Sequence, residues 1–176
     1  MQRSWTTCGS ARRLGACAVS AVSALSALSA PLHAQAPLEI GAPAPSVTLN
    51  DLDGNPLSFA TFLGQRPALI EFWATWCPLC EKLLPQIKAA HARFGDRVAF
   101  IGVNVTVNQS KTRVRRYLAE HAPPFVTLWD DQGVAVRAYD VTGTSFVVIV
   151  DGAGKIAYMG YGEDQDLMAA LQKVAR

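Results

Sequence analysis

The sequence predicts an α/β protein in which helices flank a central mixed β-sheet. Short apolar runs alternate with segments of helical periodicity, and the last two apolar runs flank the turn sequence DGAG. Alternating strands and helices favour parallel strand neighbours, whereas a tight turn joins antiparallel strands. The chain has 176 residues, half of them hydrophobic, which suffices for one core, so we expect one folded domain.

The first 34 residues have the composition of a secretory signal peptide. Three arginines precede an Ala/Ser/Leu-rich run from about residue 14 to residue 30, and no acidic residue occurs before Glu39. The run is too weakly apolar for a permanent membrane span. We expect an exported, periplasmic protein with 1–34 as signal peptide, 35–45 as a Pro/Ala-rich lead-in segment and 46–176 as the folded domain. A retained membrane anchor is the less favoured alternative.

Removal of the signal peptide changes the charge and the cysteine content. Three arginines leave with it, so Lys plus Arg falls from 16 to 13 against 14 Asp plus Glu. A nearly neutral domain gives no electrostatic reason to expect a nucleic-acid partner. Two of the four cysteines are also removed with the signal peptide, so only Cys77 and Cys80 remain. An exported protein with a single close pair of cysteines is not a disulfide-stapled scaffold.

The first half of the domain predicts a hairpin, a buried strand and a helix. The hairpin is expected where apolar residues 47–49 and 57–59 flank the turn Asp53-Gly54. Residues 68–73 form a short apolar run typical of a buried strand. The helix that follows begins at the cysteine pair and ends before Gly95, and Pro85 is expected to kink it.

The second half predicts further alternation of strands and helices. Strands are expected over 98–105, 125–129, 146–150 and 155–159. Helices are expected over 110–120, 134–139 and 165–174, with Ser110 and Asp164 as caps of the first and the last. These elements predict a sheet that is covered on both faces.

The sequence WATWCPLC, residues 73–80, places two cysteines three positions apart where a strand ends and a helix begins. Unpaired amides and the dipole at a helix N-terminus favour a thiolate, and in Cys-x-x-Cys proteins the thiol pKa falls from about 8.5 to about 3.5–7.5. Pro78 suits the first helical turn, where an amide would have no partner. We expect Cys77 to attack a disulfide and Cys80, less exposed, to resolve the mixed disulfide.

Two other uses of the cysteine pair are disfavoured. A structural zinc site needs about four ligands, but beyond the signal peptide the chain offers two cysteines and the distant His91 and His121. A structural crosslink across so small a loop would restrict little of the unfolded chain. We therefore expect no bound metal and no cofactor.

Glu71 interrupts the apolar run six positions before Cys77. Strand alternation assigns its side chain to one face of the sheet. A half-buried carboxyl group near a thiol pair has a raised pKa and can accept and return the proton of Cys80. The alternative is that Glu71 lies at a strand edge in water.

Several segments resemble a known family. The sequence ALIEFWATWC resembles the active-site strand of thioredoxins, with Glu71 at the position of their buried acid. Over residues 43–174 the chain is similar to the TlpA/ResA-like exported thiol:disulfide oxidoreductases. The similarity includes an amino-terminal hairpin (APAPSVTLNDLDGNPLSFATFLG), the active-site helix with its proline (WCPLCEKLLPQIKAAHARF), an inserted helix near 111–120 and a carboxy-terminal hairpin (YDVTGTSFVVIVDGAGKI).

The resemblance implies a thioredoxin fold and disulfide reductase activity outside the cytoplasm. It also implies protein disulfides or dithiols as substrates and a membrane thiol transporter as electron donor. Some members of this family serve cytochrome c maturation.

One position departs from the family pattern. A cis-proline, in a pattern such as G-x-P-T, normally precedes the third strand of the family and packs against the cysteines. An ungapped comparison places Ser145 there, after Thr144, and an alignment shifted by one residue would leave the proline missing. A cis bond without proline costs about 3–4 kcal/mol, so we expect a trans Thr144–Ser145 bond. Because this loop pairs with substrate in the family, Thr144 and Ser145 join Trp76 and Pro78 as expected substrate contacts, although the departure puts substrate binding in question.

The leading hypothesis is an exported thiol:disulfide oxidoreductase that reduces protein disulfides through Cys77 and Cys80. Pro78 directly after the first cysteine also occurs in oxidising members of the superfamily, so the motif does not set the direction of electron flow. One rival is a binding protein for a soft metal such as Cu(I), which prefers thiolates. Another is a binding module of the same fold whose disulfide exchanges slowly.

Overall fold

A computed structural model describes residues 38–175, all within the compact unit Ala36–Arg176. The expected signal peptide and the first residues of the lead-in segment lie outside the described residues. Within 38–175, no helix combines the length and the apolar character needed to cross a bilayer.

Seven strands form one mixed sheet in the order β2-β1-β5-β4-β3-β6-β7. Strands β3, β4 and β5 are parallel to one another, and the remaining pairs are antiparallel. The predicted mixed sheet and both hairpins are confirmed. The strands are β1 (Thr48–Asp51), β2 (Pro56–Ser58), β3 (Ala68–Trp73), β4 (Ala99–Val105), β5 (Val126–Asp130), β6 (Phe146–Val150) and β7 (Ile156–Tyr161).

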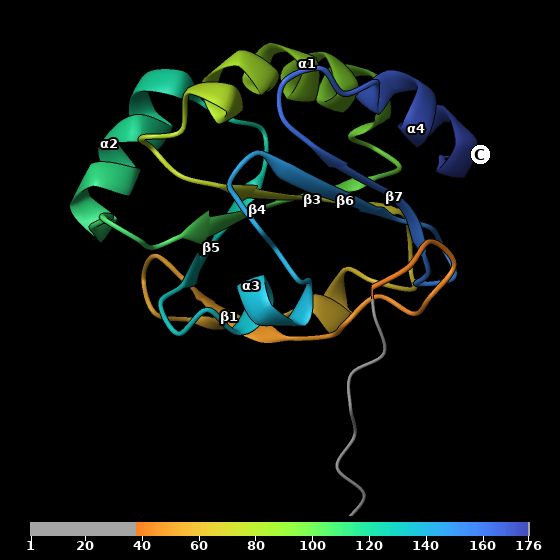
Figure 1. Ribbon diagram of the computed structural model, residues 1–176, viewed down its shortest axis with the longest axis horizontal. Coiled ribbons are helices and arrows are strands. Elements are labelled where there is room, and N and C mark those ends of the chain that lie inside the picture. Colours follow the sequence, from red (N-terminus) through yellow and green to blue (C-terminus); the bar gives the residue numbers. More distant parts are fainter. Residues whose placement is uncertain (1–37, 176) are drawn as a thin grey trace, which may run out of the picture. The chain divides into compact units, whose positions relative to one another are not determined.

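Helices cover both faces of this sheet. Figure 1 shows α1 (Pro78–Phe94), α2 (Lys111–His121) and α4 (Leu167–Val174) on one face and α3 (Val134–Ala138) on the other. A short 3₁₀ turn, η1 (Phe59–Thr61), follows β2. This layered α/β architecture is the one that the sequence predicts. The layers form because each apolar face of the sheet needs a helix or loop to exclude water.

Strand β3 lies at the centre of the core and is buried along its whole length. Ile70 and Phe72 face one apolar cluster, whereas Leu69 faces another that contains Leu83 and Ile87 of α1. Burial of each such side chain contributes about 1.5–3 kcal/mol. The carboxyl end of β3, from which the cysteine motif emerges, is therefore held by packing from both sides.

The ends of the helices match the sequence prediction with one exception. Ser110 caps α2 as expected, with its hydroxyl accepting the amide of Arg113, and Gly95 terminates α1. The expectation that Asp164 caps the last helix is wrong. Asp166 is the cap, and its carboxylate accepts the amide of Ala169 at 2.9 Å.

The described part of the lead-in segment is tied to the start of β7. The amide of Gly41 donates to the carbonyl of Ile156, and the amide of Ile156 donates to the carbonyl of Ala42. A third bond joins the amide of Ala44 to the carbonyl of Gly154. The segment thereby extends the hydrogen bonding of the sheet beyond its last strand.

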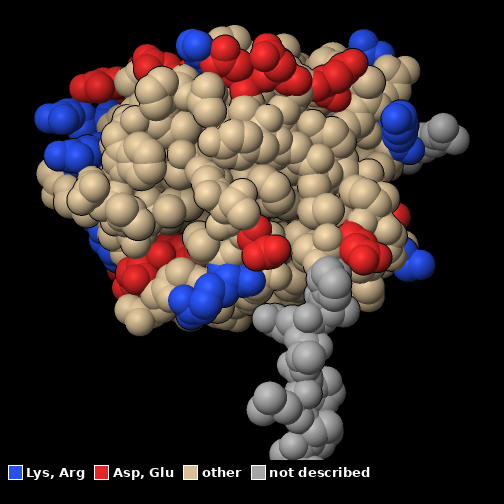
Figure 2. All heavy atoms as spheres, in the orientation of Figure 1, with Lys and Arg blue, Asp and Glu red and all other residues tan. Residues whose placement is uncertain are grey.

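Charged side chains are spread thinly over one face of the molecule. Figure 2 shows acidic and basic groups mostly around the rim of this face, with a broad uncharged area between them. Nucleic-acid-binding proteins instead gather lysine and arginine in one patch or stripe. This face has no such patch, in keeping with the nearly neutral charge of the domain.

Candidate active site

The two cysteines lie at the N-terminus of α1, immediately after β3. Cys77 is the N-cap residue, and its Sγ accepts the amide of Cys80 at 3.1 Å. Pro78 is the first helical residue, as predicted, and its side chain is exposed. Cys77 and Cys80 form a disulfide with Cα atoms 5.3 Å apart. An amide directed at Sγ stabilises negative charge there once the disulfide is reduced.

The exposure of the two cysteines differs from the expectation. Cys77 is 5% exposed and Cys80 is 4% exposed, so the predicted contrast is absent in the disulfide form. Both side chains belong to one apolar cluster with Trp73 and Val114. The contrast between them is one of position, because Cys77 precedes the helix and Cys80 lies within its first turn.

Two tryptophans flank the disulfide in different ways. Trp73 is buried, and its ring centroid lies 5.2 Å from that of Tyr117 and 5.5 Å from that of Phe125. Trp76 is 45% exposed, and its Nε1 donates to the carbonyl of Val107 at 2.7 Å. One ring therefore supports the site from beneath, while the other presents an oriented apolar surface beside Cys77.

Glu71 is buried at the centre of the sheet. It is 2% exposed on a strand flanked by β4 and β6, so the alternative of a solvated strand edge is wrong, and so is the expectation of half-burial. Strand alternation places it on the face of Trp73, beneath α1 and α2. Its sheet neighbours in register are Gly102 and Val147, neither of which carries charge.

The burial of Glu71 changes its acidity. Loss of hydration raises the pKa of Glu71 from 4.5 to about 8. Its Oε1 forms no hydrogen bond to the described residues. The carboxyl group is therefore mostly protonated at neutral pH, with a pKa close enough to neutrality for it to exchange a proton.

The loop before β6 holds the position at which the family pattern has proline. Ser145 is fully buried, has a φ of 67°, and its amide donates to the carbonyl of Phe72 at 2.8 Å. Proline has neither an amide hydrogen nor access to positive φ. The loop conformation is therefore specific to a residue other than proline at this position.

Thr144 precedes Ser145 and is half-buried. Its backbone amide and carbonyl have no hydrogen-bond partner among residues 38–175. An apolar cavity of about 200 Å³ adjoins this loop, and its walls include Trp76, Val107 and Thr144. The structure thus brings Trp76 and Thr144, two predicted substrate contacts, to one cavity.

Three residues near the site were not predicted. Tyr117 of α2 packs on Trp73, and burial raises its pKa to about 12. Asn104 is a buried polar residue in β4, whose Nδ2 donates to the carbonyl of Trp73 at 3.4 Å, and its interruption of an apolar strand was the available signal. Gln165 contacts the Ser145 loop, but the sequence gives no sign of this because the contact spans 20 residues.

Comparison with known proteins assigns the family. The sequence matches the Redoxin family over residues 39–173. The chain belongs to the Redoxin family. It is 24% identical over 139 residues to the thiol-disulfide oxidoreductase ResA of Bacillus cereus, covering 78% of this chain and 79% of that protein. It is 31% identical over 129 residues to the thiol:disulfide interchange protein DsbE of Yersinia pestis, covering 72% and 66%.

Solved structures give the same result for the fold of this Redoxin family member. The thioredoxin domain of a thiol-disulfide oxidoreductase from Bacteroides vulgatus is 26% identical, with a TM-score of 0.69 over 79% of this chain and 99% of that one. A thiol:disulfide interchange protein from Chlorobium tepidum is 22% identical, with a TM-score of 0.67 over 78% and 99%. The chain is a TlpA/ResA-like member of the thioredoxin superfamily and a thiol:disulfide oxidoreductase, as its motif predicts.

Proposed function

We propose that this protein acts outside the cytoplasm and reduces disulfides of other proteins through Cys77 and Cys80. The observation that carries the proposal is the Cys77–Cys80 pair at the start of α1, with an amide directed at the Sγ of Cys77. The amino-terminal composition supports export. We propose a membrane thiol transporter as the electron donor, as the family resemblance implies.

The proposed reaction transfers two electrons from the reduced cysteine pair to the substrate disulfide. The thiolate of Cys77 attacks one substrate sulfur, the substrate S–S bond breaks, and the other substrate sulfur leaves as a thiolate. Cys80 then loses its proton and attacks the Sγ of Cys77. This step releases the second substrate thiolate and leaves the Cys77–Cys80 disulfide.

Glu71 is proposed as the base for the second step. In its ionised form it accepts the proton of Cys80 and later returns it to a leaving thiolate. A pKa of about 8 suits this exchange, because an efficient base has a pKa near the operating pH. Its place on the Trp73 face of β3, beneath the cysteine-bearing helix, supports the assignment.

The substrate is proposed to lie across Trp76, Pro78 and Thr144. An extended substrate segment would pair, as an added strand does, with the amide and carbonyl of Thr144, which have no partner within residues 38–175. The apolar cavity beside Trp76 would then accept a side chain of that segment. This arrangement favours substrates whose cysteine lies in an accessible, extended stretch with a nearby apolar residue.

The reduction potential of the Cys77/Cys80 pair tests the direction of electron flow. The mature protein is equilibrated with dithiothreitol or glutathione buffers, and tryptophan fluorescence reports the oxidised fraction. A potential near about −270 mV or lower supports a reductase, whereas a potential near about −120 mV means that the protein donates disulfides instead.

Variants of the two cysteines test the site itself. Cys77→Ser should abolish exchange with a protein disulfide, while Cys80→Ser should accumulate a mixed disulfide through Cys77. Exchange that persists in Cys77→Ser contradicts the proposal. Copper bound to the purified wild-type protein would favour the rival metal-binding hypothesis.

A further inference from the structure

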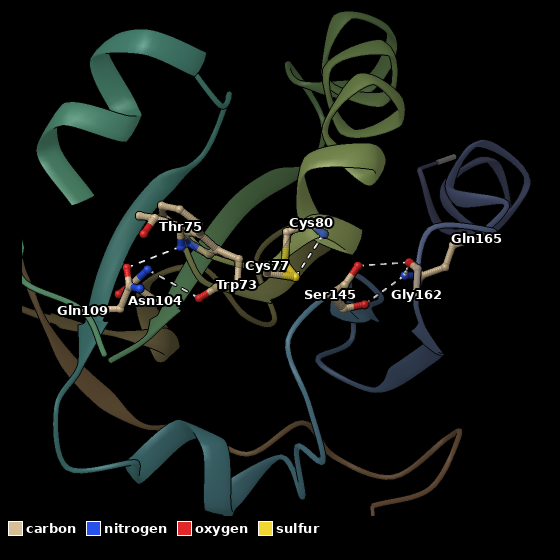
Figure 3. Close-up of a disulfide and its surroundings, with 9 residues drawn as sticks. All are labelled: Trp73, Thr75, Cys77, Cys80, Asn104, Gln109, Ser145, Gly162 and Gln165. Carbon is tan, nitrogen blue, oxygen red and sulfur yellow. Dashed lines mark hydrogen bonds between the residues drawn. A yellow bond between two sulfur atoms is a disulfide. The ribbon is translucent and has the colours of Figure 1, made fainter. Parts of the chain in front are cut away.

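We propose that Gln165 is a positioning residue that holds Ser145 in its left-handed conformation and thereby orients Thr144 toward the partner of Cys77. The inference rests on the proposed function, since it requires a protein partner at the disulfide. Gln165 lies just before α4, 20 residues after Ser145, and is 5% exposed. Figure 3 shows its side chain reaching from this segment to Ser145 and Gly162.

The side-chain amide of Gln165 joins two segments of backbone. Its Nε2 donates to the carbonyl of Ser145 at 3.1 Å and to the carbonyl of Gly162 at 2.7 Å. Its Oε1 accepts the hydroxyl of Tyr158 at 3.2 Å. Because the two carbonyls can only accept, the NH₂ end of the amide faces them, and Oε1 is left to accept the hydroxyl of Tyr158.

Ser145 and Gly162 are also bonded to each other. The amide of Gly162 donates to the carbonyl of Ser145 at 3.1 Å, and the hydroxyl of Ser145 donates to the carbonyl of Gly162 at 3.1 Å. The carbonyl of Ser145 therefore accepts two bonds, one from backbone and one from Gln165. The amide of Ser145 also donates to the carbonyl of Phe72, so every polar group of Ser145 forms a hydrogen bond.

This set of bonds supplies what a proline ring would otherwise supply. A ring fixes φ covalently, whereas Ser145 must be held at a φ of 67°, which a residue with a Cβ rarely adopts without support. The peptide between Thr144 and Ser145 takes its orientation from that φ and from the bond to Phe72. The direction in which the carbonyl of Thr144 points is thus set by contacts on the far side of Ser145.

The hydrogen bonds of Gln165 also depend on the absence of a side chain at Gly160. A Cβ at this position would overlap the hydroxyl of Tyr158 and the Oε1 of Gln165. Any larger residue would force these two side chains to shift and would disturb the bond between Tyr158 and Gln165. The site therefore depends on β7 as well as on the loop before β6.

Gln86 of α1 offers a matched control. This half-buried glutamine also bonds the segment between β7 and α4, through its Nε2 and the carbonyl of Glu163 at 2.9 Å. It does not contact Ser145. Gln165→Met and Gln86→Met remove the same kind of hydrogen bond with little change in side-chain volume, but only the first releases Ser145.

The test measures exchange of the reduced mature protein with two disulfides. Insulin needs the backbone contacts of Thr144, whereas the small reagent 5,5′-dithiobis(2-nitrobenzoate) needs only Cys77. Loss of a buried hydrogen bond predicts that Gln165→Met lowers kcat/KM for insulin about tenfold, through KM. The rate with the small reagent and the reduction potential stay at the wild-type values, and Gln86→Met changes neither rate.

A second readout is independent of activity. Hydrogen exchange of the Ser145 amide in the disulfide form should become faster in Gln165→Met and stay unchanged in Gln86→Met. Tyr158→Phe, which removes one bond from the amide of Gln165, should have the same effects to a smaller degree. It serves as the milder variant if Gln165→Met folds poorly.

The outcomes separate the two proposals. Equal insulin kinetics and equal exchange for the two methionine variants overturn the positioning role and leave the proposed function intact. A parallel loss with insulin and with the small reagent also overturns it, since that pattern means general damage to the site. Failure of the wild type to reduce insulin or the small reagent overturns the proposed function, and the positioning role with it.

Discussion

Replacement of Glu71 by Gln should make the stability of the protein less dependent on pH. The carboxyl group has a pKa of about 8 in the folded protein and an ordinary value of 4.5 when exposed. Because the folded state holds the proton more tightly, the contribution of Glu71 to stability is fully present below pH 4.5 and is lost as the pH rises toward 8. One pKa unit corresponds to about 1.4 kcal/mol, so the loss over this range is at most about 5 kcal/mol.

The neutral amide of the Glu71→Gln variant has no proton to lose, so the variant should not show this decline. The difference in unfolding free energy between the variant and the wild type should grow in favour of the variant from pH 4.5 to pH 8 by about 3–5 kcal/mol. Urea unfolding of the disulfide form at four pH values measures it, and Glu81→Gln, which removes an exposed carboxyl group of α1, is the matched control. A difference that stays constant with pH refutes the burial of an uncompensated Glu71.

Further variants test other parts of the site and fold. Glu71→Gln should slow resolution of the mixed disulfide by Cys80 about a hundredfold at pH 7 without slowing the attack by Cys77, as stopped-flow kinetics with insulin can measure. Ser145→Pro should destabilise the protein by about 3 kcal/mol or more in urea unfolding, whereas Ser145→Gly, which adopts positive φ freely, should be tolerated; a stable proline variant would contradict the loop conformation. Asp130→Ala should cost about 2 kcal/mol in the same assay, because the buried carboxylate accepts the amides of Val134 and Val136 at the start of α3, and an unchanged midpoint would refute that cap.

The parts of the fold that depend on local patterns were predictable. Apolar runs identified the strands, and the spacing of Cys77 and Cys80 at the end of one placed Cys77 at a helix N-terminus. The cap of α4 was not predictable, because the sequence EDQD offers two aspartates of equal propensity. Packing of Leu167 into the core selects Asp166 as the cap.

The conformation of the Ser145 loop also could not be predicted from the sequence. The comparison with the family showed that proline is absent there but not which backbone geometry replaces it. A φ of 67° has no local signature in the residues around Ser145, because it depends on bonds to Phe72, Gly162 and Gln165. The same holds for Glu71, whose position on β3 was readable while its full burial depended on α1 and α2.

The attachment of the lead-in segment decides which way the disulfide faces relative to the point where the chain enters the domain. Residues 41–44 bond to Gly154 in the turn between β6 and β7 and to Ile156 at the start of β7. The register of β3 with β6 places that turn next to Ala68, at the amino end of β3. The cysteines follow the opposite end, about 20 Å away along six residues of strand. If a surface or a neighbouring protein held the domain at residues 41–44, the end that carries the disulfide would face away from it. A large folded partner could then approach the disulfide without obstruction.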